Sequence, residues 1–398
     1  MADVKSCEKQ MNSMDIHSGG DKTLSDMPEE LLREVCLYLP SNQLHYNMRN
    51  VSKELRSVVE DLQLKPIANF VVNCGGRNSK NVQVLSVFMK NKKISLSCSK
   101  IDLTLPQGWT DSHPSYFKAA FKGKFVINKR DGVFEYRSDT KDWTSIEEPP
   151  EQFHTYSTEW ISPNVLVCVG MMMAYMPSEN WTGVACKVQI LNLDAKTPKW
   201  HAPPVLRDNP LGPAITGPYL FNTANGTMIM CGGYGDDKNT LNDTYRGILS
   251  DNKDIIRWSK LEHMPSKPCF GASFKLKNKL YIVGGMNGNE GMRSKVEWLK
   301  TSLVFDLVRE RWSKGPKIPQ ILEFPKAFTD YNEEYAFIYG DKPLGDMTKY
   351  KAIGRAESYE PVMFTFQEEH GYQEVTDVDP EIFRGKKARD FEILHTIE

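Results

Sequence analysis

The stretch Lys279-Leu280-Tyr281-Ile282-Val283-Gly284-Gly285 decides how the rest of the sequence is interpreted. A short apolar run rich in β-branched and aromatic residues is typical of a buried strand. The two glycines after it favour a backbone shape that residues with a Cβ atom disfavour, so they predict the end of that strand. Asp306 and then Trp312 follow after a long gap.

The same order of features returns upstream. Thr227–Gly233 is an apolar run that ends in two glycines, and Asn164–Gly170 is a weaker copy that ends in one. Each copy is followed by an aspartate and a tryptophan: Asp251 and Trp258, and Asp194 and Trp200. With Trp143, the tryptophans recur at intervals of 57, 58 and 54 residues. The chain is therefore built from a repeat, and the repeated Asp and Trp residues are expected to be structural, at turns and between units.

This repeat resembles the kelch repeat, in which each unit is one four-stranded blade of a β-propeller. A single unit cannot bury both faces of its small sheet, so neighbouring units must stack around an axis. Strand ends near residues 75, 128, 170, 232, 284 and 340 predict six blades. The predicted fold is mainly β, a six-bladed kelch-type propeller over residues 65–398.

The C-terminal segment Phe391–Ile397 alternates apolar and polar residues. The first blade lacks a strand before Phe70, because a helical pattern runs almost up to it. We therefore expect the C-terminal segment to pair into the first blade and to close the ring.

A different pattern precedes the propeller. Residues 1–21 are polar, lack periodicity and are expected to form a flexible tail. Residues 22–64 then predict two or three amphipathic helices, with Asp26 as a helix cap and Pro28 in the first turn. This small all-α module resembles the F-box through three landmarks: Met27–Leu31, Leu39-Pro40 and Val51–Lys53. The resemblance implies docking on a Skp-family adaptor through the following residues, which supply the adaptor surface or the core beneath it: Pro28, Leu31, Leu32, Val35, Leu39, Leu44, Val51 and Leu55.

The net charge, the apolar runs and the cysteines of the chain indicate which classes of partner and which compartment to expect. The formal charge is −1, so no overall field favours nucleic acid or an anionic membrane, and the apolar runs are of strand length, which predicts no transmembrane helix. Eight cysteines form no CxxC pair, and several lie in strand patterns as small hydrophobic residues. We expect reduced thiols and an intracellular protein, cytoplasmic, nuclear or both.

No motif predicts catalysis, a metal site or a cofactor. The Gly-Gly pairs are not followed by Lys-Ser/Thr, and the chain contains neither HExxH nor GxSxG. Some propellers are oxidases or glycosidases, so the fold itself leaves an enzyme open as an alternative. The prediction is a non-catalytic binding protein.

Binding residues are expected in the segments after the strand-ending glycines, which repeat equivalence places on one face of the propeller. The candidates for a protein substrate are Arg77, Lys80, Arg130, Met171, Met172, Met173, Tyr175, Tyr234, Asp236, Met286, Asn287 and Asp341. The methionines at 171–173 form either a soft apolar patch for a partner or a long loop folded back on its own blade.

Together the two resemblances imply a substrate receptor of an SCF-type cullin-RING ubiquitin ligase. Such a protein makes no bond itself, and instead raises the concentration of a substrate near the ubiquitin-charged enzyme. The alternative is a kelch scaffold that binds a partner without ubiquitin transfer, its helices serving only as a cap.

Overall fold

The computed structural model describes most of the chain beyond residue 67. The described residues are 68–73, 82–90, 93–100, 117–121, 124–129, 132–137, 142–150, 155–176, 181–194, 197–202, 215, 217–224, 226–235, 240–287, 297–330, 333–344, 358–375, 377–378 and 392–397. The chain divides into two compact units, Met1–Lys65 and Pro66–Glu398, and all described residues belong to the second. The predicted tail and helical module lie outside them.

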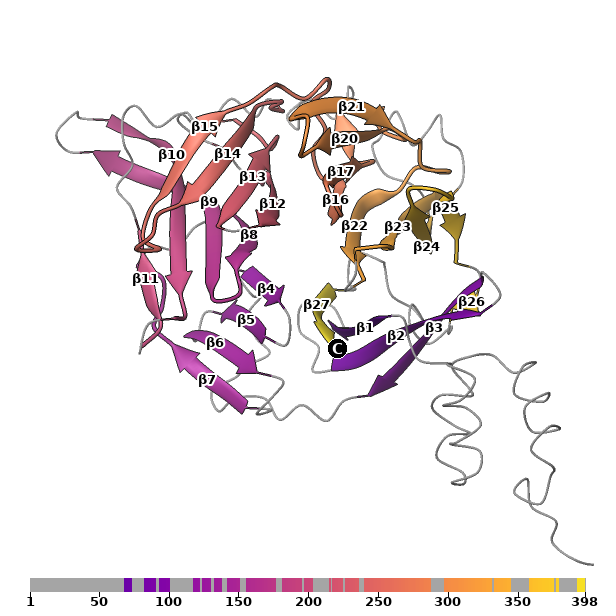
Figure 1. Ribbon diagram of the computed structural model, residues 1–398, viewed down its shortest axis with the longest axis horizontal. Helices are drawn as coiled ribbons and strands as arrows, with labels where there is room; N and C mark the ends of the chain where they lie inside the picture. The colour runs from indigo at the N-terminus through magenta and orange to yellow at the C-terminus, as the bar shows by residue number, and fades with distance from the viewer. Residues whose placement is uncertain are drawn as a thin grey trace, which may run out of the picture. The chain divides into compact units, whose positions relative to one another are not determined.

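The fold is mainly β, because every regular element in the described ranges is a strand. Within those ranges, no helix has the length and apolar character needed to cross a membrane. Figure 1 shows the sheets following one another around a common centre in a β-propeller arrangement. The first strands of neighbouring sheets contact each other in sequence order: β4 (Phe117–Phe121) with β8 (Thr155–Ser162), β8 with β12 (Tyr219–Ala224), β12 with β16 (Ala272–Leu276), and β16 with β22 (Glu323–Thr329).

Four consecutive sheets are four-stranded and antiparallel, with their strands in chain order. The first contains β8 (Thr155–Ser162), β9 (Val165–Met176), β10 (Trp181–Asn192) and β11 (Lys199–His201). The second contains β12 (Tyr219–Ala224), β13 (Thr227–Cys231), β14 (Thr244–Leu249) and β15 (Ile256–Lys260). The third contains β16 (Ala272–Leu276), β17 (Lys279–Val283), β20 (Ser302–Asp306) and β21 (Arg311–Gly315). The fourth contains β22 (Glu323–Thr329), β23 (Ala336–Leu344), β24 (Ser358–Gln367) and β25 (Gly371–Glu374).

These four sheets are established blades, whereas the sequence pattern predicts six. Two further sheets have side chains that lie mostly outside the described residues. One has the order β4 (Phe117–Phe121), β5 (Lys124–Lys129), β6 (Gly132–Arg137) and β7 (Asp142–Ile146). The other has the order β26 (Asp377–Val378), β3 (Lys93–Lys100), β2 (Val82–Lys90), β1 (Ala68–Asn73) and β27 (Glu392–Ile397).

The C-terminal strand β27 pairs antiparallel with β1, from Asn69 opposite Ile397 to Asn73 opposite Glu392. The short strand β26 joins the far side of the same sheet, parallel to β3. Segments from both ends of the second unit therefore share one sheet.

Each established blade packs through both of its faces. In β9, Val165, Val167 and Val169 belong to the apolar cluster shared with the β12–β15 sheet, whereas Leu166 and Cys168 belong to the cluster shared with β4–β7. Successive strand residues point to opposite faces, so a fully apolar run is required when both faces are covered. This explains why the repeated strands are continuous apolar runs rather than alternating ones.

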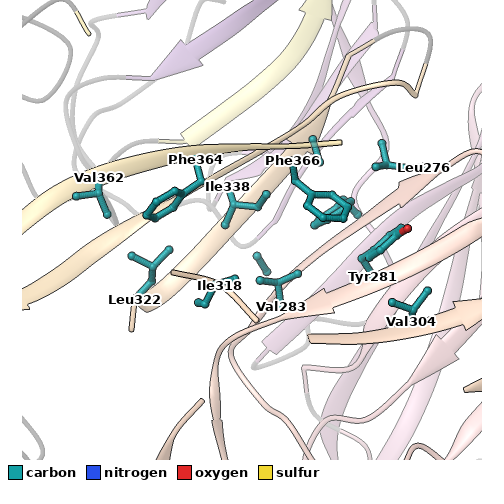
Figure 2. Close-up of a cluster of buried hydrophobic side chains, with 13 residues drawn as sticks. Leu276, Tyr281, Val283, Val304, Ile318, Leu322, Ile338, Val362, Phe364 and Phe366 are labelled. Carbon is teal, nitrogen blue, oxygen red and sulfur yellow. The ribbon is translucent and has the colours of Figure 1, made fainter. Parts of the chain in front are cut away.

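Figure 2 shows the same arrangement at the boundary between the third and fourth established blades. Phe364 and Phe366 of β24 meet Tyr281 and Val283 of β17. The Tyr281 and Phe366 rings meet edge to face at an interplanar angle of 62°, with centroids 5.2 Å apart. Burial of these rings and of the aliphatic side chains around them contributes free energy that holds the two blades together.

The recurring Trp and Asp residues have the structural roles predicted for them. Trp312 Nε1 donates to Thr244 Oγ1 of the preceding blade at 3.0 Å, and Trp200 Nε1 donates to the Glu147 carbonyl of the preceding sheet at 2.7 Å. Asp306 Oδ1 accepts from the backbone N–H groups of Val308 and Arg309, both at 2.9 Å, and so fixes the β20–β21 turn. The tryptophans thus join blades, and the aspartate fixes a turn.

Paired and single glycines behave differently. Gly284 and Gly285 have φ of 65° and 83°, and β17 ends before them as predicted. A single glycine does not end its strand: β9 continues through Gly170 to Met176, and β23 continues through Gly340 to Leu344. The prediction of strand ends at these two positions is wrong, because one glycine is compatible with extended backbone as well as with a turn.

A polar region interrupts the apolar boundary between the β8–β11 and β12–β15 sheets. Glu159 lies opposite Val167 and Asn222 lies opposite Met228, so both are on the facing sides of these sheets. Burial raises the pKa of the Glu159 carboxyl to about 7, opposed by a hydrogen bond from the Trp160 N–H and by the charge of Lys275. The Asn222 Oδ1 atom is buried and has no partner among the described residues.

We predict that Glu159→Gln removes a pH dependence of stability. The unfolded carboxyl titrates near 4.5 and the folded one near 7, so the unfolded state releases its proton first as pH rises. The wild-type protein should therefore lose stability between these two values, by roughly 1–3 kcal/mol, and the Gln variant should not. Urea unfolding of both proteins across this range measures the difference. Glu369→Gln, at an exposed carboxyl, is the control, and a gap between wild type and Glu159→Gln that stays constant with pH would contradict the prediction.

We predict that Gly285→Ala severely destabilises the propeller. A Cβ atom there would lie 2.4 Å from the Cys269 carbonyl oxygen and 2.6 Å from the Gly271 nitrogen, at a φ that already favours glycine. The expected loss is ~3 kcal/mol or more in urea unfolding.

Gly217→Ala is the matched control for this substitution. Gly217 has a similar φ of 58°, but nothing lies within 4 Å of its added Cβ. It should therefore lose only about 1 kcal/mol, from backbone strain alone. Equal losses in the two variants would show that the close approach at Gly285 has no effect.

Candidate functional site

The residues predicted to bind partners fall into three groups. All eight adaptor-binding candidates, from Pro28 to Leu55, lie outside the described residues, as do Arg77, Lys80, Arg130 and Asp236. The candidates Met171, Met172, Met173 and Tyr175 were expected in a loop but lie in strand β9, paired with β10. Asp341 was also expected in a loop, but it lies in β23 opposite Glu323 and is 2% exposed. Tyr234, Met286 and Asn287 follow the glycine pairs as the sequence shows, but Met286 and Asn287 form a short strand, β18 (Met286–Asn287), rather than a loop.

Tyr234 and Met286 come together at one end of the propeller, where β13 and β17 finish at their glycine pairs. We call this end the strand-end face. Met286 exchanges two backbone hydrogen bonds with Cys269, at 2.9 and 2.8 Å, and lies opposite Trp298 in the two-stranded sheet of β18 (Met286–Asn287) and β19 (Glu297–Trp298). Tyr234 Oη donates to Cys269 Sγ at 3.0 Å, and the Cys269 thiol donates to the Met286 carbonyl at 3.1 Å. These bonds fix a small buried cluster of Tyr234, Cys269 and Met286.

Four aromatic rings extend from this cluster across three neighbouring blades. The Tyr234 and Phe270 centroids are 5.2 Å apart, Phe270 and Phe324 are 5.7 Å apart, and Phe324 and Trp298 are 5.7 Å apart. We call Tyr234, Phe270, Phe324 and Trp298 the aromatic row. Tyr234 is buried, whereas Phe270 and Phe324 are each 38% exposed. Within the aromatic row, Tyr234 is therefore held in the buried cluster, whereas the rings of Phe270 and Phe324 are accessible to solvent.

The two accessible rings stand on unusual backbone. Phe270 has a φ of 54° and Phe324 a φ of 43°, in the left-handed region that bulky residues rarely adopt. Each conformation costs on the order of 1–2 kcal/mol relative to ordinary backbone. Phe270 directly precedes Gly271 and β16, and its position is fixed because the Gly271 N–H donates to Tyr219 Oη of the preceding blade at 2.8 Å. Phe324 is near the start of β22, so the two residues occupy similar places in successive blades.

Sequence reasoning missed Phe270, Phe324 and Trp298. It searched after the strand-ending glycines, whereas Phe270 and Phe324 precede or open the first strand of a blade. The available signal was an aromatic residue at that position in two successive repeats, in Cys269-Phe270-Gly271 and Glu323-Phe324-Pro325. The positive φ that distinguishes these two phenylalanines has no signature in the sequence.

The described part of the chain contains no cluster of metal-ligating side chains, and its cysteines Cys168 and Cys231 are buried. No three His, Cys, Asp or Glu side chains gather within it as a metal site. Burial raises the pKa of the Cys168 and Cys231 thiols, which keeps them protonated and unreactive. The aromatic row presents apolar ring surface, and the one hydroxyl in it, Tyr234 Oη, already donates to Cys269.

Comparison with known proteins places one family domain on the chain. The family model described as "F-box domain" matches residues 24–67. A search of curated protein sequences found no significant match. Among solved structures, one titled "Structure of YjhT" aligns at a TM-score of 0.49 and 11% identity, over 78% of this chain and 98% of that chain.

We predict that Cys168 and Cys231 resist alkylation in the native protein. Both thiols are buried, and burial raises the pKa of each above that of a free cysteine. Treatment with a maleimide at pH 8, followed by mass spectrometry of the peptides, should find both unmodified, and full modification after denaturation in urea. Native alkylation at the rate of a free thiol would contradict the burial of these strands.

The three landmarks that resemble the F-box fall within residues 24–67, the segment that the family model matches. The match covers a short part of the chain, and the propeller follows it in sequence. The comparison therefore identifies a segment similar to the F-box domain at residues 24–67 of this chain.

Proposed function

We propose that this protein is the substrate-recognition subunit of an SCF-type cullin-RING ubiquitin ligase. The observation that carries the proposal is the match of residues 24–67 to the F-box domain in a chain that continues into a β-propeller. The F-box would bind a Skp-family adaptor, and through it the cullin-RING ligase. The propeller would hold a protein substrate, and the protein would act inside the cell, in the cytoplasm, the nucleus or both.

In this proposal the propeller has six kelch-type blades over residues 65–398. The sheets β4–β7 and β26-β3-β2-β1-β27 supply the two blades beyond the four established ones, and β27 closes the ring. Contacts of β27 with β4 join the five-stranded sheet to its neighbour and support this closure. A closed ring gives a rigid platform, which suits a receptor that must hold its substrate in one orientation.

Catalysis in this function is by proximity. The receptor brings a substrate lysine close to the ubiquitin-charged enzyme and so raises its effective concentration. Rigidity matters more than reactivity for this task.

The adaptor-binding residues proposed are those at helical spacing in residues 28–55. We predict that Leu31→Asp with Val35→Asp abolishes capture of purified Skp-family adaptor by the full-length protein, because carboxylates replace apolar contact side chains. A pull-down measures this. Since these substitutions lie in the first unit, the propeller of the double variant should keep the wild-type circular dichroism and melting temperature.

Two controls decide how the pull-down is interpreted. Glu34→Gln, between the two altered positions, should leave adaptor capture intact. If folded wild-type protein captures no adaptor, the ligase function fails, and an interaction scaffold without ubiquitin transfer becomes the better account.

A further inference from the structure

The outer strands of the second and third established blades carry the same four residues. The sequence Arg257-Trp258-Ser259-Lys260 lies in β15, and Arg311-Trp312-Ser313-Lys314 lies in β21. Each is the last strand of its sheet, and Figure 1 shows β21 on the outside of its blade. The tryptophans pack between blades, whereas the arginines and lysines are exposed and add nothing to the core.

Only one of the two lysines is neutralised by its own blade. Asp243 and Thr301 occupy the same place in the two blades, because the carbonyl of each accepts a hydrogen bond, at 3.0 Å, from the first glycine of the Gly-Gly pair. Asp243 Oδ1 lies 2.7 Å from Lys260 Nζ. Thr301 has no carboxylate, and Lys314 forms no ion pair with any described residue. The third blade therefore keeps the basic residues of the repeat without the acid that would offset them.

Other charges near β21 offset each other and leave three basic residues behind. Asp306 interacts with the charge of Arg309 in the β20–β21 turn, and Glu310 forms an ion pair with Arg246 of the preceding blade. The basic residues that remain are exposed and form no ion pair within the described part of the chain. Protection of an edge strand does not explain their lack of an acid, because β15 is an edge strand too and has one. We call these three residues the basic edge: Arg311, Lys314 and Lys317.

The surroundings of the basic edge favour a short acidic segment over a long polyanion. The two neighbouring blades carry exposed acids, Asp251 and Glu262 in the second and Glu369 and Glu374 in the fourth. Glu262 Oε2 accepts a hydrogen bond from the Trp312 N–H at 3.3 Å, so one carboxylate already lies against β21. A nucleic acid or an anionic membrane would extend over these acids and be repelled by them, whereas a few carboxylates on one segment need only the basic edge.

We propose that the basic edge binds an extended acidic segment of the protein substrate, whose Asp or Glu carboxylates pair with Arg311, Lys314 and Lys317. The inference rests on the proposed function, since it names the chemistry of the substrate that the ligase receptor would take. Arg311 and Lys314 are roughly 10 Å apart along the strand, so carboxylates at a similar spacing on an extended segment reach both. Exposed ion pairs are individually weak, so the contact adds specificity and a modest affinity that salt screens.

The test measures binding of a fluorescein-labelled peptide of alternating Glu and Thr residues to the full-length protein, by fluorescence anisotropy at low salt. The wild type should bind this peptide, and added NaCl should weaken the binding because it screens exposed charges. Arg311→Gln with Lys314→Gln should bind roughly threefold to tenfold more weakly, as expected for the loss of two exposed ion pairs. Both side chains are exposed, so this variant should keep the wild-type melting temperature.

Arg257→Gln with Lys260→Gln is the matched control. It alters the same sequence at the same place in the neighbouring blade, and it changes the net charge by the same amount. Because Asp243 already offsets Lys260, this variant should bind the peptide within about twofold of the wild type.

The proposal is overturned if the wild type does not bind the peptide at low salt, or if the two double variants weaken binding equally. It is also overturned if a labelled single-stranded oligonucleotide binds more tightly than the peptide and Arg311→Gln with Lys314→Gln weakens that binding, which would assign the basic edge to nucleic acid. Adaptor capture is measured on the same proteins. Its failure counts against the ligase function, whereas failure to bind the peptide with adaptor capture intact counts against the basic edge alone.

Discussion

The structure depends on the need to bury both faces of small sheets. A blade of four short strands has too little area to hold together alone, and its apolar strands expose a hydrophobic surface on each side. Val167 of β9 packs toward one neighbour and Cys168 toward the other, so no blade is stable without the next. Trp200 and Trp312 donate hydrogen bonds to the preceding sheets. These bonds fix the orientation of neighbouring blades, which apolar packing alone leaves unspecified. The folded state is therefore stabilised by the packing of blades on one another and not by any single blade.

The same requirement creates the strand-end face. Strands must end together for blades to stack, and the chain turns sharply there through pairs of glycines. At Gly285 the backbone passes so close to Cys269 that no side chain fits. That close approach places Phe270 and Met286 side by side on neighbouring turns. The position of the aromatic row is thus a consequence of how the blades end.

The β-propeller arrangement was predictable from the sequence, although six blades were predicted and four are established, whereas the aromatic row was not predicted. Apolar runs such as Thr227–Cys231 specify buried strands, and the paired glycines specify their ends, because both signals are local. Gly170 and Gly340 misled the prediction, since a lone glycine takes the conformation that its neighbours impose. The aromatic row joins residues of three blades, and its exposed members are defined by φ values that only the folded chain fixes. Local patterns therefore predict scaffolds better than they predict surfaces assembled across a scaffold.

The pairing of β1 with β27 bears on how the protein comes to be folded during synthesis. Residues 68–73 leave the ribosome early, but their partner strand, residues 392–397, is made only after all the intervening blades. Until then one edge of β1 carries N–H and C=O groups that will pair last. A nascent chain in that state offers an open strand edge to other chains, and long-range pairings of this kind form slowly. We therefore expect the partly synthesised propeller to bind chaperones, and to be released from them when strand β27 pairs with β1.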